Sequence, residues 1–438
     1  MVRRDGQTAF LTKAVSPYAL ALVSYAIFLL AWSFPPAAYV SYMDEPDYIF
    51  MDMSALAFYS LCVISFLLGV WLLDLLLPVA GLNDETLVCR LSPVTFLLIP
   101  LGFGLVFSVI SNIIIIRSAP DLFRLFLEQG GAELKTELQF QSALGMAGIY
   151  LIGIVWWATW RCDQLNLQGR QRRLVKIAQY LATASVILST ILKLVRGELM
   201  PVIIGVAIIY LLRKSFRAER QGAFLVKFFV IFASSLLVLF LLGSFVRGTT
   251  DLTKDVFAYT IASYNRLAAL LSGRLRYPYG GRGIYLFSFL GYNNMLNMVV
   301  PFRDILRWPS FMEYWQSEFR AMGPAGLTEN AIWGGAFGYI FADIGWLAPF
   351  FVFFEGLLCG VVWRSVKLGR PLGIVLYPWF AFCILFWFGM NSLFENKLLP
   401  LVLDVLGLAI YESLCLRYET PQTSLSKYSA AEPGIPAY

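Results

Sequence analysis

The sequence predicts an all-α polytopic membrane protein, and three features of its composition and patterning carry this prediction. Hydrophobic residues make up 59% of the chain and charged residues 14%, whereas a soluble domain has roughly 45–50% apolar and about 25% charged residues. The third feature is that apolar runs recur along all 438 residues. One integral membrane domain therefore explains the length better than two or three soluble domains.

Ten apolar runs are candidates for transmembrane helices, since a helix that crosses a bilayer needs about 20 apolar residues. These runs lie at approximately 17–34, 54–77, 94–116, 142–160, 175–194, 199–212, 224–246, 331–363, 373–390 and 398–415. The first run has no small-residue cleavage site after it, so we interpret it as an uncleaved anchor.

The distribution of lysine and arginine sets the orientation, because these residues accumulate in cytoplasmic loops. With both termini in the cytoplasm, the cytoplasmic segments hold nineteen basic residues and the four short outer segments hold six. The chain then divides into a cytoplasmic N-terminus (1–16), a membrane domain with seven helices (17–246), a large outer loop with helices (247–330), a membrane domain with three helices (331–415) and a disordered cytoplasmic tail (416–438).

Two of the ten runs have unusual lengths. The run 199–212 would span roughly 21 Å at about 1.5 Å per residue, which is short of a hydrocarbon core of about 30 Å. The run 331–363 would span roughly 50 Å as one helix, so we expect a break near Asp343-Ile344-Gly345 and a short outer helix before the true span. These two irregular elements flank the outer loop, and we expect the active site between them.

Composition also excludes several kinds of chemistry. The chain has no histidine and no CxxC pair, so a histidine base, a Ser-His-Asp triad and a zinc site are not expected. We expect no metal and no cofactor. The net charge of +6 comes from basic residues in loops, without a basic stripe interleaved with aromatics, so no nucleic-acid partner is expected. Membrane lipids are expected neighbours.

The sharpest local feature is the segment Arg196-Gly197-Glu198, which precedes the short run. Charges at membrane depth are costly and are functional candidates by default. Arg196 at the positive end of a helix that begins near Glu198, with Pro201 in its first turn, would form a diphosphate-binding site. The alternative is a tight outer turn in which Arg196 extends to lipid headgroups.

The large outer loop is rich in arginine and poor in lysine. Arginine binds phosphate bidentately and lysine does not. The arginines of the loop are Arg247, Arg266, Arg274, Arg276, Arg282, Arg303, Arg307 and Arg320, and its only lysine is Lys254. Tyrosines such as Tyr264 and Tyr292 are interleaved and could hold sugar rings. We expect Ile284 to Pro301 to form one packed helix and Arg276 to be structural or lipid-facing. The alternative is an amphipathic cap with its arginines on anionic headgroups.

Carboxylates are the candidate general bases, because an acceptor hydroxyl must lose a proton and histidine is absent. Glu198, Glu329 and Asp343 are the candidates, and Asn330 beside Glu329 is a candidate glycan ligand where the loop re-enters the membrane. For each acid the alternative is a helix cap or an ion pair.

Three stretches resemble the Wzy-type oligosaccharide repeat-unit polymerases, which make O-antigen and exopolysaccharide. They are RGELMPVIIGVAIIYLL, FVRGTT…AYTIASYNRLAALLSG and TENAIWGGAFGYIFADIGWLAPFFVFFEGLLCGVVWR. The resemblance implies a metal-independent, GT-C-like membrane glycosyltransferase in the bacterial inner membrane, with the outer loop in the periplasm. Its substrates would be undecaprenyl-diphosphate-linked oligosaccharides, and a chain-length regulator is a possible partner. The growing glycan would move onto the non-reducing end of a new unit.

The resemblance also assigns roles to arginines. Arg196, Arg247 and Arg266 match the arginine positions best, with Arg282 as a fourth candidate. The chain departs from the family in lacking paired outer loops with arginine and glycine ten residues apart. The alternatives are an O-antigen ligase-like glycosyltransferase, which the absence of histidine disfavours, a flippase or transporter of lipid-linked saccharides, and a non-catalytic partner of an assembly complex.

Overall fold

A computed structural model of the chain is helical, with one short sheet of two strands among the described residues. It describes residues 13–43, 45, 52–78, 86–118, 151–165, 167–192, 196–215, 260–329, 332–391, 393–395 and 397–419. The all-α class is confirmed. The segment 118–141, the predicted span 224–246 and the tail after 419 lie largely or wholly outside the described residues.

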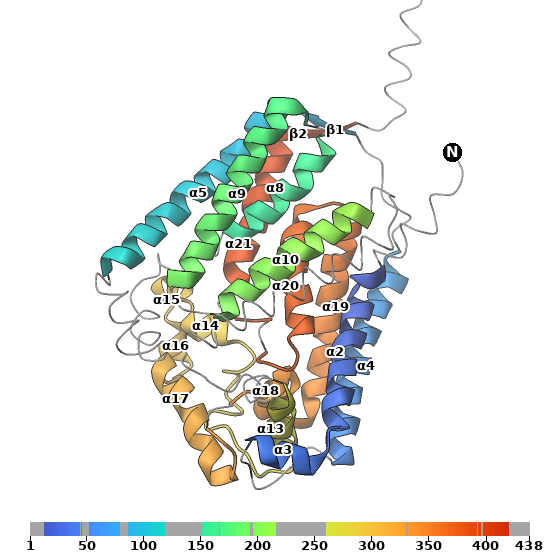
Figure 1. Ribbon diagram of the computed structural model, residues 1–438, viewed down its shortest axis with the longest axis vertical. Coiled ribbons are helices and arrows are strands. Elements are labelled where there is room, and N and C mark those ends of the chain that lie inside the picture. The colour runs from blue at the N-terminus through green and yellow to red at the C-terminus, as the bar shows by residue number, and fades with distance from the viewer. Residues whose placement is uncertain are drawn as a thin grey trace, which may run out of the picture.

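Most of the long helices run side by side along the long axis of the molecule (Figure 1). Their bounds are α2 Pro17–Trp32, α4 Met53–Leu76, α5 Pro93–Ser118, α8 Ile152–Gln164, α9 Gly169–Leu192, α10 Arg196–Ser215, α19 Ala348–Lys367, α20 Pro371–Leu385 and α21 Leu398–Cys415. The short α3 (Pro36–Met43) is bent by 90° from α2. The prolines at 35 and 36 account for this bend, since proline disfavours helix at the preceding residue.

Four helical segments are long and apolar enough to cross a membrane among the described residues. They are Met53–Leu76, Pro93–Arg117, Gly335–Lys367 and Leu398–Cys415, and the bent pair α2–α3 makes a fifth if it is one span. A membrane protein is therefore supported. Other predicted spans are shorter as apolar helices, for example Met200–Arg213 and Pro371–Leu385. The structure thus supports four or five of the ten predicted spans.

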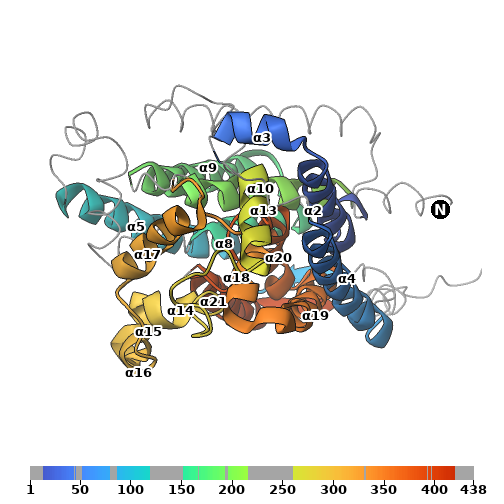
Figure 2. The same ribbon diagram turned by 90° about the horizontal axis from the view of Figure 1, so that it is seen from below.

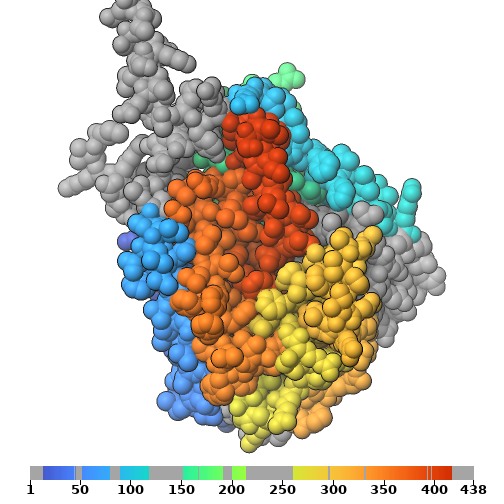
Figure 3. Space-filling model, turned by 180° about the vertical axis from the view of Figure 1, so that it is seen from behind, coloured from blue at the N-terminus to red at the C-terminus, as the bar shows by residue number. Residues whose placement is uncertain are grey.

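Helix α20 is the central helix of the bundle. Thirteen of its fifteen residues are buried, because α2, α8, α10, α19 and α21 all pack against it. Helices α4 and α19 approach each other most closely at glycines: a Cβ at Gly69 would lie 2.3 Å from the Phe353 carbonyl oxygen, and one at Gly356 would lie 2.2 Å from that of Phe66. Small residues allow such backbone contact between membrane helices. On the opposite face from Figure 1, α19 and α21 lie next to each other at the surface (Figure 3).

The two ends of the bundle differ. One end, which we call the sheet end, carries β1 (Thr86–Cys89) paired antiparallel with β2 (Leu416–Glu419). The pairing joins the loop before α5 to the segment after α21. The opposite end, which we call the loop end, carries α3 and the helices of the large loop (Figures 1 and 2). These helices are α13 Ile261–Leu271, α14 Ser288–Tyr292, α15 Asn294–Val299, α16 Phe302–Ile305, α17 Phe311–Met322 and α18 Gly335–Ile344.

The predictions for the two runs of unusual length differ in how well they match the structure. The predicted break near Gly345 is confirmed: α18 ends at Ile344, Gly345 has φ 58°, and a 3₁₀ turn at Gly345–Leu347 precedes α19. The predicted start of α10 near Glu198 is wrong by two residues, because the helix begins at Arg196 and includes the Arg-Gly-Glu segment. Its apolar part, Met200–Arg213, is as short as expected.

The prediction of a single helix from Ile284 to Pro301 is also wrong. The segment forms two short helices, α14 and α15, which are separated at Asn293. Asn293 has extended backbone angles, and its side chain caps α15 by accepting from the Leu296 N–H at 3.1 Å. Asparagine favours such caps over helix interiors because it bonds to nearby backbone.

Candidate functional site

A buried ion pair at the loop end joins the first outer segment to the large loop. Arg266 of α13 is fully buried, and its guanidinium donates to both carboxylate oxygens of Glu45, at 3.1 Å for Nη1 to Oε2. The Tyr39 hydroxyl of α3 donates to Glu45 and accepts from Arg266 at 3.0 Å. Both charges are therefore paired and hydrogen-bonded in the interior, as a buried charge must be if it is not to destabilise the fold.

The ion pair also holds the segment after α17. The Thr328 N–H donates to Glu45 Oε1 at 2.9 Å, and Arg266 Nη2 donates to the Thr328 carbonyl at 3.2 Å. The next residue, Glu329, is exposed. Two buried side chains therefore fix the backbone immediately before a candidate base, and the geometry supports a positioning role for Arg266.

Glu45 was missed as a site residue at the sequence level. The signal was present, because the first outer segment carries four acids, at 44, 45, 47 and 52, and no basic residue. The large loop carries eight arginines. Opposite charges on two segments at one end of a bundle indicate an ion pair between them.

An open hollow lies between α17 and the loop that follows α13. Its volume is ≈ 570 Å³, and it is lined by Gly273, Arg274, Arg276, Pro278, Tyr279, Glu313, Ser317, Arg320, Ala321, Pro324 and Ala325. The three arginines are exposed at its wall. Arg276, which was expected to be structural or lipid-facing, lines the hollow, and its role stays a prediction.

Alternation along the chain explains how two of these arginines reach the hollow. Arg274 and Arg276 are exposed, whereas Leu275 and Tyr277 between and beside them are buried in the packed core of the loop end. Extended backbone points successive side chains to opposite sides. The alternation of charged and apolar residues in the sequence Arg-Leu-Arg-Tyr is typical of such an extended segment with one exposed side.

Aromatic and acidic groups complete the wall of the hollow. The Tyr279 hydroxyl donates to Glu313 Oε1 at 2.8 Å, and the Arg282 guanidinium lies 5.5 Å from the Tyr279 ring centre. Arg282 is thus next to the hollow, in contact with one of its lining residues. Glu329 Oε1 lies 3.0 Å from where a Cβ would stand at Gly323, directly before Pro324 of the wall.

Asp343 binds backbone in the structure. Its carboxylate accepts from the N–H groups of Gly283 at 3.1 Å, Tyr285 at 2.7 Å and Leu286 at 3.0 Å. Asp343 belongs to the last turn of α18, so it fastens the loop segment that carries Arg282 to the helix before the span. These contacts support a positioning role, and catalysis by Asp343 stays a prediction.

The expected glycan-binding tyrosines are packed in the interior, which corrects the expectation of open aromatic faces. Tyr264 is fully buried and packs edge-on against Phe28 and Tyr59, with ring centres 5.2 and 5.6 Å away. Tyr292 is buried against Trp308, and its hydroxyl donates to the Pro309 carbonyl at 3.2 Å. Burying these aromatic rings stabilises the fold, and neither ring is left to line the hollow.

Glu318 is a buried acid on the other face of α17 from the hollow. Tyr339 donates to its Oε2 at 3.1 Å, and Tyr277, Tyr285 and Tyr314 belong to the same packed core. Burial raises the pKa of Glu318 to about 8, although hydrogen bonds from Tyr314 and Tyr339 act to lower it. Its carboxyl group is therefore mainly protonated at neutral pH.

Four of the predicted site residues are described only in part or not at all. The backbone of Arg196 and Glu198 forms the first turn of α10, and their side chains lie outside the described structure. Arg247 and Asn330 lie outside the described residues altogether. Their roles stay predictions.

Comparisons with protein family models, with curated proteins and with solved structures found no match to this chain. Arginine side chains around an open hollow, beside an exposed carboxylate, can bind a phosphorylated ligand and accept a proton from a hydroxyl.

Proposed function

We propose that the protein is a metal-independent membrane glycosyltransferase that polymerises lipid-linked oligosaccharide repeat units. The observation that carries the proposal is the hollow at the loop end, with Arg274, Arg276 and Arg320 in its wall and Glu329 beside it. Guanidinium groups suit a diphosphate because they bind its oxygens in pairs. The substrate would be undecaprenyl-diphosphate-linked oligosaccharide, as the resemblance to Wzy-type polymerases implies.

The proposed reaction transfers the growing glycan from its lipid diphosphate to a new unit. The acceptor hydroxyl at the non-reducing end bonds to the anomeric carbon of the glycan, and the bond from that carbon to the diphosphate breaks. Glu329 takes the hydroxyl proton, and the electron pair leaves on the diphosphate. Arg274, Arg276 and Arg320 then stabilise the negative charge that grows on the leaving group. Arg196, Arg247 and Arg282 are proposed to assist, with Glu198 as the alternative base.

The proposed topology has ten spans in the bacterial inner membrane, with the loop end in the periplasm. The sheet end supports the part of this topology that puts two segments on the same side, because β1 pairs with β2 and the basic residues assign both segments to the cytoplasm. At the loop end, Glu45 contacts Arg266 and Thr328, and all three belong to segments assigned to the outer face.

The test is polymerisation by purified protein in vesicles with synthetic undecaprenyl-diphosphate repeat units, with products separated on a gel. Wild type should give a ladder of polymers. The double variant Arg276→Ala/Arg320→Ala should lose activity by roughly a hundredfold, because the leaving diphosphate loses two charge-assisted partners. Arg303→Ala is the matched control, since Arg303 is half exposed and pairs with Asp304 away from the hollow.

Two outcomes would contradict the proposal. One is a folded wild-type protein that gives no ladder with a matching substrate. The other is equal activity of Arg303→Ala and the double variant, which would exclude the hollow as the site.

A further inference from the structure

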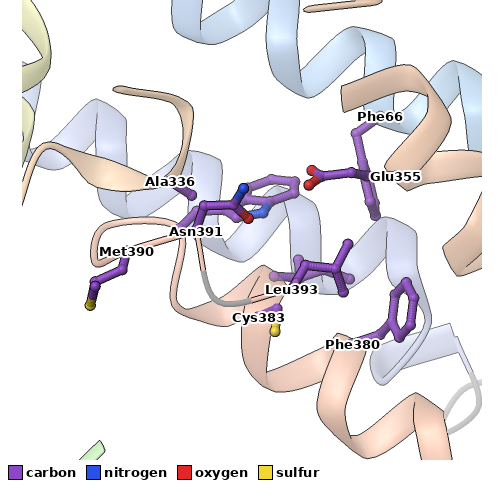
Figure 4. A pocket seen from close by; sticks show the side chains of 10 residues that line it. Phe66, Ala336, Glu355, Phe380, Cys383, Met390, Asn391 and Leu393 are labelled. Atoms are coloured by element: carbon purple, nitrogen blue, oxygen red, sulfur yellow. The ribbon is translucent and has the colours of Figure 1, made fainter. Parts of the chain in front are cut away.

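A small, partly enclosed cavity lies between α4, α18, α19, α20 and the segment that follows α20 (Figure 4). Its volume is ≈ 20 Å³, and its lining is Phe66, Ala336, Glu355, Phe380, Cys383, Ile384, Trp387, Met390, Asn391 and Leu393. A polar cavity needs roughly 10–15 Å³ to hold one water molecule. The space therefore fits a single water.

Two polar side chains face this cavity without satisfied hydrogen bonds. Glu355 is 5% exposed, and its Oε1 has no hydrogen-bond partner among the described residues. The Asn391 Nδ2 likewise has none in this part of the chain. Figure 4 shows the Glu355 carboxyl group directed across the cavity toward Asn391. An unpaired buried polar group is costly, so two such groups at one cavity indicate a shared ligand.

The surroundings of Glu355 decide which form of the carboxyl group is stable. Within the described residues no ion pair involves it, and it interacts electrostatically with the thiols of Cys62 on α4, Cys359 on α19 and Cys383 on α20. The charged side chains of the segment after α20, Glu395 and Lys397, pair with each other. An unpaired carboxylate in such a site is far less stable than its neutral acid.

We propose that Glu355 and Asn391 form a proton-binding site inside the membrane, in which the neutral Glu355 acid and Asn391 are bridged by one water. The neutral acid either donates its hydroxyl proton to the water oxygen or accepts from the water through its carbonyl oxygen, and the Asn391 amide N–H donates to the same water. A metal cation is disfavoured, because the remaining walls are aromatic and aliphatic and supply few oxygen ligands. The proposal stands apart from the polymerase function, since glycan transfer needs no proton site at this depth.

The cavity lies at the joint between the bundle and the loop end. The Ala336 N–H of α18 donates to the Trp387 carbonyl at 2.8 Å, and the Ser24 hydroxyl of α2 donates to the Ile384 carbonyl at 2.6 Å. These bonds fix the segment that carries Asn391, which is partly exposed.

A hydrophobic carbodiimide tests the protonation state directly. In the reaction, the carboxylic O–H adds across one C=N bond of dicyclohexylcarbodiimide: the carboxyl oxygen bonds to the central carbon, the proton moves to nitrogen, and nothing leaves. Full-length protein in vesicles is treated at neutral pH, and peptides are analysed by mass. Glu355 should be labelled about tenfold or more above Glu412, the matched control, because the reaction needs the proton of a neutral acid and the Glu412 carboxylate is bound by the Arg161 guanidinium at 2.5 Å.

The outcomes separate three possibilities. Equal labelling of the two acids, or no labelling of Glu355 in folded protein, would overturn the proposal. Protection of Glu355 by sodium ions but not by a larger organic cation would assign the site to a metal cation and overturn it as well.

Infrared spectroscopy detects a protonated carboxyl group without a reagent that has to reach the cavity. Wild type should show the carbonyl stretch of a protonated acid that is absent in Glu355→Gln, and deuterated water should shift it. Asn391→Ala should keep this band but move its frequency, because the bridging water loses one partner. An unmoved band in folded Asn391→Ala would show that no water is shared.

Discussion

Two buried arginine–glutamate pairs lie at opposite ends of the bundle, and their surroundings differ. At the sheet end, Arg161 of α8 binds Glu412 of α21 through Nε at 2.5 Å and Nη2 at 2.8 Å. At the loop end, Arg266 binds Glu45. All four side chains are at most 5% exposed. The two pairs are therefore alike in chemistry and in burial.

The partners of the sheet-end pair are all structural. Arg161 also donates to Gln164 at 2.5 Å and to the Gly369 carbonyl at 2.9 Å, and Trp157 donates to Glu412 at 2.6 Å. The loop-end pair instead binds the backbone of Thr328, beside the exposed Glu329 and the hollow. The comparison teaches that burial and ion pairing alone do not indicate function. The residues that a pair positions are the better guide.

The largest expected effect comes from breaking one partner of the sheet-end pair. Arg161→Met should destabilise the fold by about 3–5 kcal/mol, because Glu412 is left charged and unpaired. The double variant Arg161→Met/Glu412→Leu should recover most of this loss and keep polymerase activity. Thermal unfolding in detergent measures the first effect, and the polymer ladder measures the second. A double variant that folds but is inactive would show that the sheet-end pair has a functional role.

The matching change at the loop end should separate stability from activity. Glu45→Leu/Arg266→Met removes both charges, so its thermal unfolding should stay near that of wild type. Its activity should fall roughly a hundredfold, because Thr328 and Glu329 lose the two side chains that hold them in place. If this variant and the sheet-end double variant have the same activity, the distinction between the two pairs is wrong.

A pH dependence of stability is expected from Glu318 at the loop end. The folded pKa of Glu318 is about 8, above its usual value of 4.5, so the unfolded chain releases this proton first. As pH rises from about 4.5 to about 8, stability should fall with a slope on the order of 1.4 kcal/mol per unit, and level off above that. Glu318→Gln should reduce this slope when unfolding is measured at pH 5 and pH 8. An unchanged slope would assign the pH dependence to other groups.

The smallest effect is expected from an exposed ion pair on the membrane bundle. Lys367 binds Asp74 at 3.0 Å, with side chains 32% and 29% exposed. Asp74→Asn should change stability by at most about 1 kcal/mol, since solvent screens such pairs. The same unfolding assay that detects Arg161→Met provides the measurement. A larger loss would mean that this pair is less solvated than its exposure indicates.

Local patterns predicted the bounds of some helices, but they did not predict the contacts between distant residues at the loop end. The bounds of α21 and the break at Gly345 follow from apolar runs and one glycine, which are short-range signals. The Arg266–Glu45 contact joins residues that are 221 positions apart, and no periodicity predicts such a distance. Tyr264 and Tyr292 were misplaced for a related reason, because composition does not show which face of a loop helix is buried.

The hollow could be predicted from the sequence only in part. Arginine enrichment of the outer loop is the basis of the proposed chemistry, whereas the prediction for Arg276 did not use the alternation of exposed and buried residues around it. Arg320 comes from α17, so its place in the same wall depends on how two segments of the loop pack. Sequence patterns identified the residue type, and only packing identified the residues.

The antiparallel pairing of β1 with β2 also has a consequence for the order in which the molecule is made. Thr86 is paired with Glu419, and Cys89 with Leu416, so β1 has no partner until the ribosome has completed α21. Contacts between distant parts of a chain form late. During synthesis β1 is an open edge at the sheet end, and its closure marks the completion of the bundle. Chains that stop before Leu416 would keep this edge exposed, which makes them recognisable to quality control.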